Sequence, residues 1–320
     1  MLRKPPPLGF IVRLAWFVSA AEPALPDPRL VTGRLHRGEG TFLSVEHCQR
    51  PSCSLGQRAC RPRMNPPASP AGHRGNHHAR PTGPRGVTGT ESLKEQAGIA
   101  ACQFITDGMA LGLGTGSTVR YSIIEIARMI EQEGIEVAGV PTSEDTRQLA
   151  EMLGIPLLEI RDAGSLDLTI DGADEFDQNF DLIKGGGGAL TREKIVALAS
   201  EAMVVVADDS KQVSTLGTFP LPVEVDGMAW DSAREGISAL CPGPVALRGG
   251  EDDPFVTDNR GYILDCSFGP TISNPSDLES RIRAIDGVVE AGLFVGICDA
   301  VVMASQDEVS TLVKPGGRLG

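Results

Sequence analysis

The chain has 320 residues and a formal net charge of −13, but this charge is distributed unevenly along the sequence. Residues 1–90 contain 13 of the 29 Lys and Arg residues and 4 of the 42 Asp and Glu residues, so residues 91–320 carry a net charge of −22. Such an acidic surface repels nucleic acids and anionic membranes, and neither is expected as a partner. All five histidines lie in residues 1–90, which excludes a Ser-His-Asp triad or a His-ligated metal site within residues 91–320.

The first ninety residues differ in composition from the rest of the chain. Residues 1–90 are rich in Pro, Arg and Gly and lack a sustained periodicity, which predicts a disordered basic extension to which we assign no function. The apolar stretch at 8–20 resembles part of an export signal, but Arg13 interrupts it and it is too short to span a bilayer. The cysteines and histidines of the extension have the chemistry of zinc ligands, yet their spacing matches no zinc motif. An alternative is that the extension is not native, because Val87, a residue that alternative start codons encode, precedes a natural helix start.

Four cysteines lie in the acidic part of the chain, at positions 102, 241, 266 and 298. They are far apart and show no C-x-x-C spacing, and most of them lie in or beside apolar runs, which is typical of reduced thiols in a core. A reducing, cytoplasmic location is therefore expected.

Apolar residues recur after residue 90 with alternating helix and strand periods. In chain order, the pattern predicts a helix at 91–105, a strand at 109–113, a helix at 118–132, a strand at 136–140, a helix at 143–153, strands at 157–160 and 166–170, a helix at 191–202 and a strand at 203–207. This alternation predicts an α/β fold with a mostly parallel, doubly wound sheet. Ligands of such sheets bind beyond the carboxyl ends of the strands, and the glycine-rich and aspartate-rich segments of this chain fall there.

The rhythm changes after residue 220, where the predicted elements become shorter. In chain order they are a strand at 223–225, a helix at 229–240, strands at 245–248 and 262–268, a helix at 275–285 and a strand at 288–294. Short strands with two helices predict a small α+β lid. A last strand at 300–304 is expected to return to the first sheet.

The first motif is the segment GLGTGST at 112–118, between a predicted strand and a predicted helix. Its glycines permit a tight turn, and its free N–H groups, the helix N-terminus and the hydroxyls of Thr115, Ser117 and Thr118 can surround a phosphate. The segment is no dinucleotide fingerprint, because Ser117 stands where that fingerprint has its third glycine. The alternative interpretation is an ordinary turn.

The second motif is LTIDGADE at 168–175, in which a predicted strand ends in Asp171 and Asp174. Carboxylates at a strand end can bind sugar hydroxyls or move protons. The alternatives are an Asx-turn or a metal site, although the calcium-loop pattern is absent.

The third motif is KGGGGALTREK at 184–194. Four consecutive glycines indicate a place where the main chain approaches a ligand closely, and Lys184 can neutralise an oxyanion. Glu193 is either a catalytic carboxylate or a first-turn glutamate that the helix dipole favours. A weaker fourth motif is DDSK at 208–211, in which Lys211 is either a surface charge or a second cation for a phosphate.

Taken together and in this order, the motifs resemble those of the ribose-5-phosphate isomerase family of the A type. The matching segments are GLGTGSTV at 112–119, DGADE at 171–175, KGGGGALTREKI at 184–195, DDSKQV at 208–213, PLPVEV at 220–225 and FVTDN at 255–259. The resemblance runs from about residue 91 to the C-terminus. Departures are mild: Gly188 stands where Ala is common, Asp209 occupies the variable place of the A-D-x-S-K motif, and the turn at 259–261 replaces the usual D-N-G-N turn.

The resemblance implies an isomerase that interconverts D-ribose 5-phosphate and D-ribulose 5-phosphate through an enediolate, in the pentose phosphate pathway, without cofactor or metal. It also implies a Rossmann-like catalytic domain at 91–216 plus 298–320, a lid domain at 217–297, and assembly as a homodimer or homotetramer. One alternative is a non-catalytic sugar-phosphate sensor of the same fold. A related amino-sugar deaminase or lactonase is disfavoured, because those enzymes use a catalytic histidine that residues 91–320 lack.

The resemblance also assigns roles to particular residues. Thr115, Gly116, Ser117 and Thr118 are expected to hold the phosphate, with Lys94 and Lys211 as cationic partners. Asp171, Asp174 and Lys184 are expected to contact the sugar and assist ring opening, and Glu193 is the expected proton acceptor. Further substrate contacts are expected from the residues that flank these charged groups, namely Gly172, Ala173, Gly185, Gly186 and Gly187.

Overall fold

The structure, a computed structural model, describes residues 89–319. The sequence hypotheses for the basic extension, namely disorder, an export signal or a zinc site, therefore fall outside the described residues. Within those residues, every helix is too short or too polar to cross a lipid bilayer.

A six-stranded sheet forms the centre of the larger core. Its strands lie in the order β13 (Val309–Val313), β12 (Ala300–Ala304), β6 (Ser200–Asp208), β3 (Leu166–Gly172), β1 (Ala110–Leu113) and β2 (Ala138–Pro141). Neighbouring strands are parallel except β12 and β13, which pair antiparallel. The expected mostly parallel sheet is thus confirmed, and so is the return of residues 300–304 to it.

Helices cover both faces of this sheet, as continuous apolar strands require. Alternate residues of β6 divide between two cores: Val204 and Val206 pack with α1 (Thr90–Ala101), α2 (Val119–Arg128) and α3 (Glu144–Met152). Met203 and Val205 pack on the other face, where Ala197 of α5 (Leu190–Leu198) joins them. The doubly wound arrangement therefore follows from the uninterrupted apolar run in β6.

A second, antiparallel sheet has the strand order β10 (Val288–Ala291), β7 (Leu221–Val225), β9 (Tyr262–Cys266) and β8 (Val245–Leu247). The helices α6 (Trp230–Ser238) and α7 (Pro275–Arg283) contribute Ile237 and Ile282 to its core. This is the α+β arrangement expected for the lid. The proposed domain boundaries at 216/217 and 297/298 stay a prediction, because the described residues belong to one compact unit.

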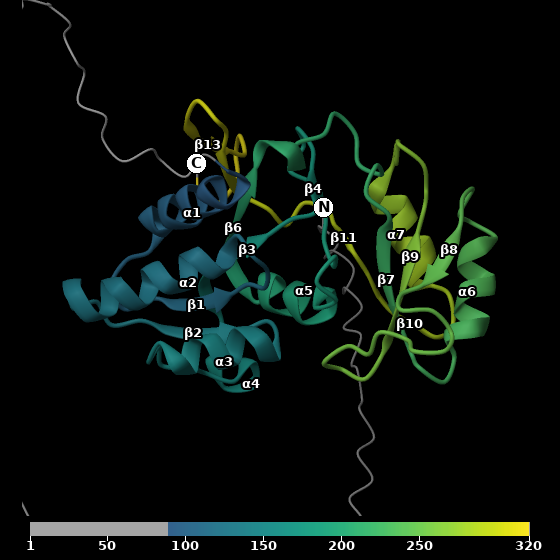
Figure 1. Cartoon of the computed structure of the whole chain (residues 1–320), viewed down its shortest axis with the longest axis horizontal. Helices are drawn as coiled ribbons and strands as arrows, with labels where there is room; N and C mark the ends of the chain where they lie inside the picture. The colour runs from purple at the N-terminus through teal and green to yellow at the C-terminus, as the bar shows by residue number, and fades with distance from the viewer. Residues whose placement is uncertain (1–88, 320) are drawn as a thin grey trace, which may run out of the picture. The chain divides into compact units, whose positions relative to one another are not determined.

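A small three-stranded sheet, in the order β11 (Leu293–Phe294), β5 (Leu182–Ile183) and β4 (Glu175–Phe176), lies between the two larger sheets (Figure 1). Successive residues of β5 and β11 point to opposite cores: Leu182 and Phe294 pack toward the six-stranded sheet, and Ile183 and Leu293 toward the four-stranded sheet. The strand period of two thus joins both cores through one thin layer.

Most expected elements begin or end a few residues from their expected bounds, and three differ by more than that. The expected strand at 157–160 is a single bridge between Gly139 and Leu157, because the chain turns into the short helix α4 (Ile160–Ala163). The expected helix at 191–202 ends at Leu198, since sheet pairing with Leu166 places Ser200 in β6.

The expected strand at 288–294 is two strands, β10 and β11, that belong to different sheets. Gly292 separates them, and its N–H donates to Pro222 O at 2.8 Å while its carbonyl accepts from Lys184 N at 2.9 Å. A Cβ atom there would overlap the backbone of Lys184 and Pro222, so only glycine fits between these chains. The strand β13 and the two-residue strands β4 and β5 were not expected from the sequence.

The four described cysteines are buried and unpaired. Burial raises the pKa of Cys102 to about 12, so its thiol stays protonated. The expectation that these cysteines are unpaired residues of the core is confirmed.

Candidate active site

A cavity of about 450 Å³ opens at the carboxyl ends of β1, β3 and β6, where the parallel sheet is expected to bind its ligand. It is lined by the expected phosphate loop, part of the DGAD motif, the start of the glycine segment and three charged side chains from helices: Thr115–Thr118, Gly172–Asp174, Lys184–Gly187, Lys94, Glu193 and Lys211. Asp171 lies fully buried beneath the lining. All expected site residues therefore gather at one place.

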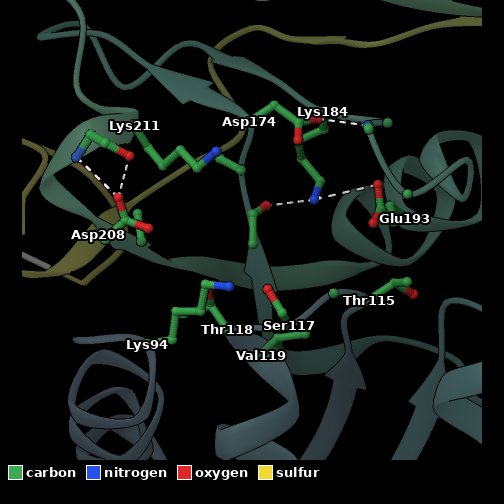
Figure 2. Close-up of a pocket in the computed structure, with 18 of the residues that line it drawn as sticks. Lys94, Thr115, Ser117, Thr118, Val119, Asp174, Lys184, Glu193, Asp208 and Lys211 are labelled. Carbon is green, nitrogen blue, oxygen red and sulfur yellow. Dashed lines mark hydrogen bonds and ion pairs between the residues drawn. The ribbon is translucent and has the colours of Figure 1, made fainter. Parts of the chain in front are cut away.

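Lys184 lies between the buried carboxylates of Asp171 and Glu193, and Figure 2 shows its ammonium joined to Glu193 by a dashed line. Its Nζ is 3.0 Å from Asp171 Oδ2 and 3.4 Å from Glu193 Oε2, and it donates to the carbonyl of Gly172 at 2.6 Å. Asp171 comes from β3, Lys184 follows β5 and Glu193 lies in the first turn of α5. One ammonium thus faces two carboxyl groups, and all three side chains are buried.

Asp171 Oδ2 and Glu193 Oε2 are buried, and neither accepts a hydrogen bond from the described residues. Both oxygens lie within ion-pair distance of Lys184 Nζ. Leaving a buried acceptor without a donor costs about 1–3 kcal/mol, and more for a charged group. Glu193 lines the cavity and Asp171 does not, so a ligand hydroxyl can remove that cost at Glu193 Oε2.

Burial shifts the pKa values of this charged group. Burial is the main cause that raises the pKa of Glu193 to about 8; the charge of Asp171 adds to the rise, and Lys184 opposes it. Burial also raises the pKa of Asp171 above its ordinary value, against the attraction of Lys184. For Lys184, burial opposes the charged form, but the charges of Asp171 and Glu193 outweigh it and raise the pKa of the ammonium. Glu193 is therefore suited to take and return a proton near neutral pH.

Asp171 also fixes the start of the phosphate loop. Its Oδ1 accepts from the backbone N–H of Thr115 at 3.0 Å and of Gly172 at 2.7 Å. A Cβ atom on Gly114 would overlap the Asp171 side chain, which explains the glycine at that position. The first and second sequence motifs are thus joined through one carboxylate.

The hydroxyl of Thr115 has partners away from the expected phosphate position. Its Oγ1 bonds to Thr142 at 2.7 Å and to Ser143 at 2.8 Å, and Thr146 lies 3.3 Å away. Sequence reasoning missed this cluster of hydroxyls, which follows β2 and begins α3. Both the hydroxyl and the backbone N–H of Thr115 are thus engaged within the protein itself, and its expected contact with the phosphate stays a prediction.

Asp174 is held by the glycine segment. The N–H of Gly186 donates to Asp174 Oδ2 at 2.7 Å, and a Cβ atom at Gly186 would overlap that carboxylate. Figure 2 shows Asp174 beside Lys184. Asp174, Lys184 and Glu193 form what we call the carboxylate end of the cavity. The close approach that four glycines indicated is thus made, in part, to the protein's own carboxylate.

The opposite end of the cavity is rich in donors and cations. Figure 2 shows Ser117 and Thr118 near Lys94 of α1, with Lys211 across the cavity from them. Within the described residues, no hydrogen bond uses the backbone N–H groups of residues 116–119. Lys94 has one acidic neighbour, Glu91, at 3.6 Å. This end can hold a phosphate through N–H groups, hydroxyls and two ammonium groups.

Five other residues line the cavity without having been expected: Thr90, Val119, Ala207, Asp208 and Ser210. Asp208 and Ser210 belong to the fourth motif, and the Asp208 carboxylate accepts from Ser210 N at 3.0 Å, which shapes the turn that carries Lys211. The position of this motif directly after a predicted strand was the signal that could have identified Asp208 and Ser210.

Within residues 89–319, no cluster of His, Cys, Asp and Glu side chains is arranged to hold a metal ion.

Comparison with known proteins decides the family. Residues 138–308 match the model of ribose 5-phosphate isomerase A (phosphoriboisomerase A). Ribose-5-phosphate isomerase A of Bacillus mycoides is 45% identical over 219 residues, which are 68% of this chain and 98% of that protein. The chain belongs to the ribose 5-phosphate isomerase A family. A second family member, from Cereibacter sphaeroides, is 48% identical over 223 residues, 68% of this chain and 89% of that protein.

Solved structures of the family have the same fold. Ribose 5-phosphate isomerase A of Methanocaldococcus jannaschii superposes with a TM-score of 0.67 at 39% identity, covering 71% of this chain and all of that one. A D-ribose-5-phosphate isomerase in complex with phospho-erythronic acid superposes with a TM-score of 0.68 at 37% identity, with the same coverage. The α/β fold and the family resemblance are thereby confirmed.

Proposed function

We propose that this family member interconverts D-ribose 5-phosphate and D-ribulose 5-phosphate, with Glu193 as the group that transfers the proton. The observation that carries the proposal is the position of Glu193. Its carboxylate is buried and has an oxygen without a hydrogen-bond donor, and it lines the same cavity as Lys94 and Lys211. Membership of an isomerase family supports the reaction type.

The phosphate of the substrate would bind at the end formed by Ser117, Thr118, Lys94 and Lys211. Residues 91–320 carry a charge of −22, so a sugar phosphate binds only where local cations and N–H groups reverse the field. The N–H groups of residues 116–119, which have no partner in the described part of the chain, supply those donors. Anchoring the phosphate there places the carbon chain toward Lys184 and Glu193.

The proton transfer would proceed in two steps at the carboxylate end. In the open-chain aldose, the Glu193 carboxylate removes the proton from C2, and the bonding electrons move to the carbonyl oxygen on C1 to form an enediolate. The hydroxyl proton of O2 passes to O1, and Glu193 returns its proton to C1, which gives the ketose with no net change in atoms or electrons. Lys184 and the N–H groups of the glycine segment stabilise the negative oxygen of the intermediate.

Asp171 and Asp174 would act before this step, on the cyclic sugar. Ring opening needs a base for the anomeric hydroxyl and an acid for the ring oxygen. Asp174 lines the cavity beside Lys184, so it is the carboxylate placed to touch the sugar hydroxyls. Asp171 is buried beneath the lining, and its role would be to hold Lys184 and the phosphate loop.

The ligand of the related isomerase supports this orientation. Phospho-erythronic acid carries a phosphate and a carboxylate. These two groups match the two ends of the cavity in this chain, since a planar carboxylate resembles the enediolate in shape and charge. A non-catalytic sensor would need the phosphate end alone, so the buried Lys184 and Glu193 favour an enzyme.

The remaining proposals concern assembly and location. We expect a homodimer or homotetramer in a cytoplasmic compartment, and light scattering of the purified chain would measure the former. No nucleic acid or membrane is expected as a partner, because of the acidic charge.

The decisive experiment is an assay of ribulose 5-phosphate formation from ribose 5-phosphate. Purified chain is expected to turn over the substrate, whereas Glu193→Gln is expected to bind it without turnover. Normal turnover by the glutamine variant would contradict the assignment of Glu193, and absence of turnover by the unaltered chain would contradict the proposed function.

A further inference from the structure

One arginine from the four-stranded sheet contacts the glycine segment of the active site. Arg248 follows β8, and its Nη1 donates to the carbonyl of Gly185 at 3.0 Å and to that of Gly186 at 3.1 Å. Its side chain is 18% exposed. No sequence motif pointed to Arg248, which lies 63 positions from Gly185 and 62 from Gly186.

The guanidinium of Arg248 is itself held on two sides. Its Nε and Nη2 donate to the two carboxylate oxygens of Asp265 in β9, at 3.0 and 2.5 Å, in a bidentate pair. The ring of Phe255 lies 5.7 Å from its Cζ, at a cation–π distance. Phe255 also contacts the segment, because a Cβ atom on Gly188 would overlap its ring. A planar guanidinium fixed in this way presents Nη1 in one direction only.

The orientation of Arg248 determines where two peptide N–H groups of the segment point. Every described peptide bond is trans, so the C=O and N–H of one peptide unit point in opposite directions. Holding Gly185 O on one side turns the N–H of Gly186 to the other, where it donates to Asp174 Oδ2 at 2.7 Å. Holding Gly186 O likewise turns the N–H of Gly187 away from Arg248.

Gly187 lines the cavity, and no hydrogen bond among the described residues uses its N–H. The N–H of Gly188, by contrast, donates to Gly185 O at 2.9 Å and closes the turn. Gly185 and Gly188 have φ angles of 105° and 81°, which residues with a side chain rarely adopt. Glycine can adopt these angles, but it has no preference for them over its other allowed conformations. An external contact is therefore needed to select this conformation of the segment.

We infer that Arg248 is a positioning residue for the isomerase reaction: it orients the Gly185–Gly187 peptides so that Asp174 is held and the Gly187 N–H faces the reacting oxygen. This inference rests on the proposed function, because it assigns the freed N–H to the enediolate oxygen. The clamp consists of Arg248, Asp265 and Phe255, and it brings part of the smaller sheet into the catalytic geometry of the larger one.

A purely structural link between the sheets predicts a different result from a positioning role. Loss of a structural link lowers stability and leaves the turnover of the folded enzyme unchanged. Loss of positioning lowers kcat, because one oxyanion donor typically contributes about 10²–10³-fold and small displacements are costly. Affinity at the phosphate end should change little in either case, since Arg248 lies against the glycine segment and not against residues 116–119.

The test is Arg248→Lys in the full chain, with Arg234→Lys as the matched control. Arg234 also pairs with carboxylates, Asp231 at 2.7 Å and Glu251 at 3.0 Å, and lies 4.8 Å from the Trp230 ring, but it touches no residue of the cavity. Lysine keeps the positive charge but lacks the planar guanidinium, whose N–H groups bind Asp265 and the glycines at the same time. We expect kcat to fall about 10- to 100-fold in Arg248→Lys and to stay within about two-fold in Arg234→Lys.

Two probes locate the effect within the cavity. Inorganic phosphate reports the cationic end, and its dissociation constant should stay within about two-fold in Arg248→Lys. Phospho-erythronic acid reports both ends, and its affinity should fall about ten-fold or more. A folded Arg248→Lys enzyme with unchanged kcat, or with equal losses of affinity for both probes, would overturn the inference.

If Arg248→Lys does not fold, Asp265→Asn provides the test, because it leaves Arg248 in place and weakens the bidentate pair that orients the guanidinium. A fall of about three- to ten-fold in kcat with unchanged phosphate affinity supports the inference, and unchanged kcat overturns it. Failure of the proposed function is distinguishable, since the unaltered chain would then show no turnover. In that case the two probes still decide whether Arg248 orients the segment.

Discussion

The two ends of the cavity are built in opposite ways. At the carboxylate end, Asp171, Lys184 and Glu193 are each less than 5% exposed, and their charges meet at distances of 3.0 and 3.4 Å. At the phosphate end, Lys94 and Lys211 reach the cavity on long side chains from α1 and from the short 3₁₀ helix Asp209–Lys211. One end is buried and its charges are paired, and the other end is more exposed.

This contrast separates binding from chemistry. A phosphate dianion is bound well by several exposed donors, each of modest strength, so no single side chain dominates. A proton transfer from carbon needs a carboxylate with a raised pKa, and only burial among other charges provides it. Substitutions at the two ends should therefore affect different kinetic constants, and the following predictions test that difference.

The largest expected effect is that of Glu193→Gln on kcat. The amide has nearly the shape of the carboxylate but cannot accept the proton, so kcat should fall about 10²- to 10⁴-fold with little change in substrate affinity. Steady-state kinetics and calorimetric titration measure the two quantities. Glu175→Gln is unsuitable as a control, because that carboxylate bonds to Gly217 N; the exposed Glu144→Gln, outside the cavity, is the appropriate one and should retain kcat.

Lys184→Met should have the next largest effect and should change both activity and stability. Removal of the Lys184 ammonium leaves the buried carboxyl groups of Asp171 and Glu193 without their cation. Removing one partner of a buried ion pair typically lowers the free energy of unfolding by about 3–5 kcal/mol. We expect kcat to fall about 10²-fold or more and the thermal midpoint to drop, as differential scanning fluorimetry would show. A variant that melts like the unaltered chain at pH 7 would contradict the buried ion-pair geometry.

The third prediction concerns the pH dependence of kcat/KM. Glu193 must be deprotonated to act on the aldose, and burial raises its pKa to about 8 in the free enzyme. On the acid side of the pH profile, kcat/KM should therefore rise about ten-fold per pH unit. The pKa that this rise reports should lie well above the 4.5 of an ordinary glutamate. A profile that stays flat between about pH 5.5 and 9 would show that the carboxylate is not buried as described.

The same shift makes a prediction about stability. The folded state holds a proton on Glu193 up to about pH 8, whereas the unfolded chain loses it near 4.5, so the stability contributed by Glu193 decreases as the pH rises through this window. Glu193→Gln should therefore raise the melting temperature relative to the unaltered chain at pH 9, and the difference should shrink toward pH 5. A difference that grows toward acidic pH would have the wrong sign.

The smallest expected effect lies at the phosphate end. Ser117→Ala removes one hydroxyl donor among several, so KM should rise about three- to ten-fold while kcat changes less than about two-fold. Raising the ionic strength should increase KM further, because the lysines at this end are partly exposed. An effect of Ser117→Ala on kcat alone would indicate that the two ends are not separate.

Much of this site was predictable because its signals are local in the chain. The glycine run at 185–188, the DGAD segment at 171–174 and the hydroxyl-rich turn each lie at the end of a predicted strand, and strand ends of a parallel sheet converge. The cavity contains residues of all of them. The assigned roles of these residues remain predictions until the variants are measured.

Other features were not predictable, since they depend on residues far apart in the sequence. The hydroxyl of Thr115 is occupied by Thr142 and Ser143, which no motif joined to the phosphate loop. Gly292 ends one strand and begins another because two backbones approach it, and a strand pattern does not contain that information. The clamp of Arg248 on the glycine segment likewise exists only once the two sheets are packed.

The alternating α/β fold of residues 91–320, the family and the residues that surround the cavity could all be predicted, because apolar periods and glycine motifs lie in neighbouring positions of the chain. Which charges meet, and how deeply they are buried, depends on the packed structure. Burial and pairing distances arise when strands distant in the chain come together, and they raise the pKa of Glu193 from that of an ordinary glutamate to one suited for proton transfer.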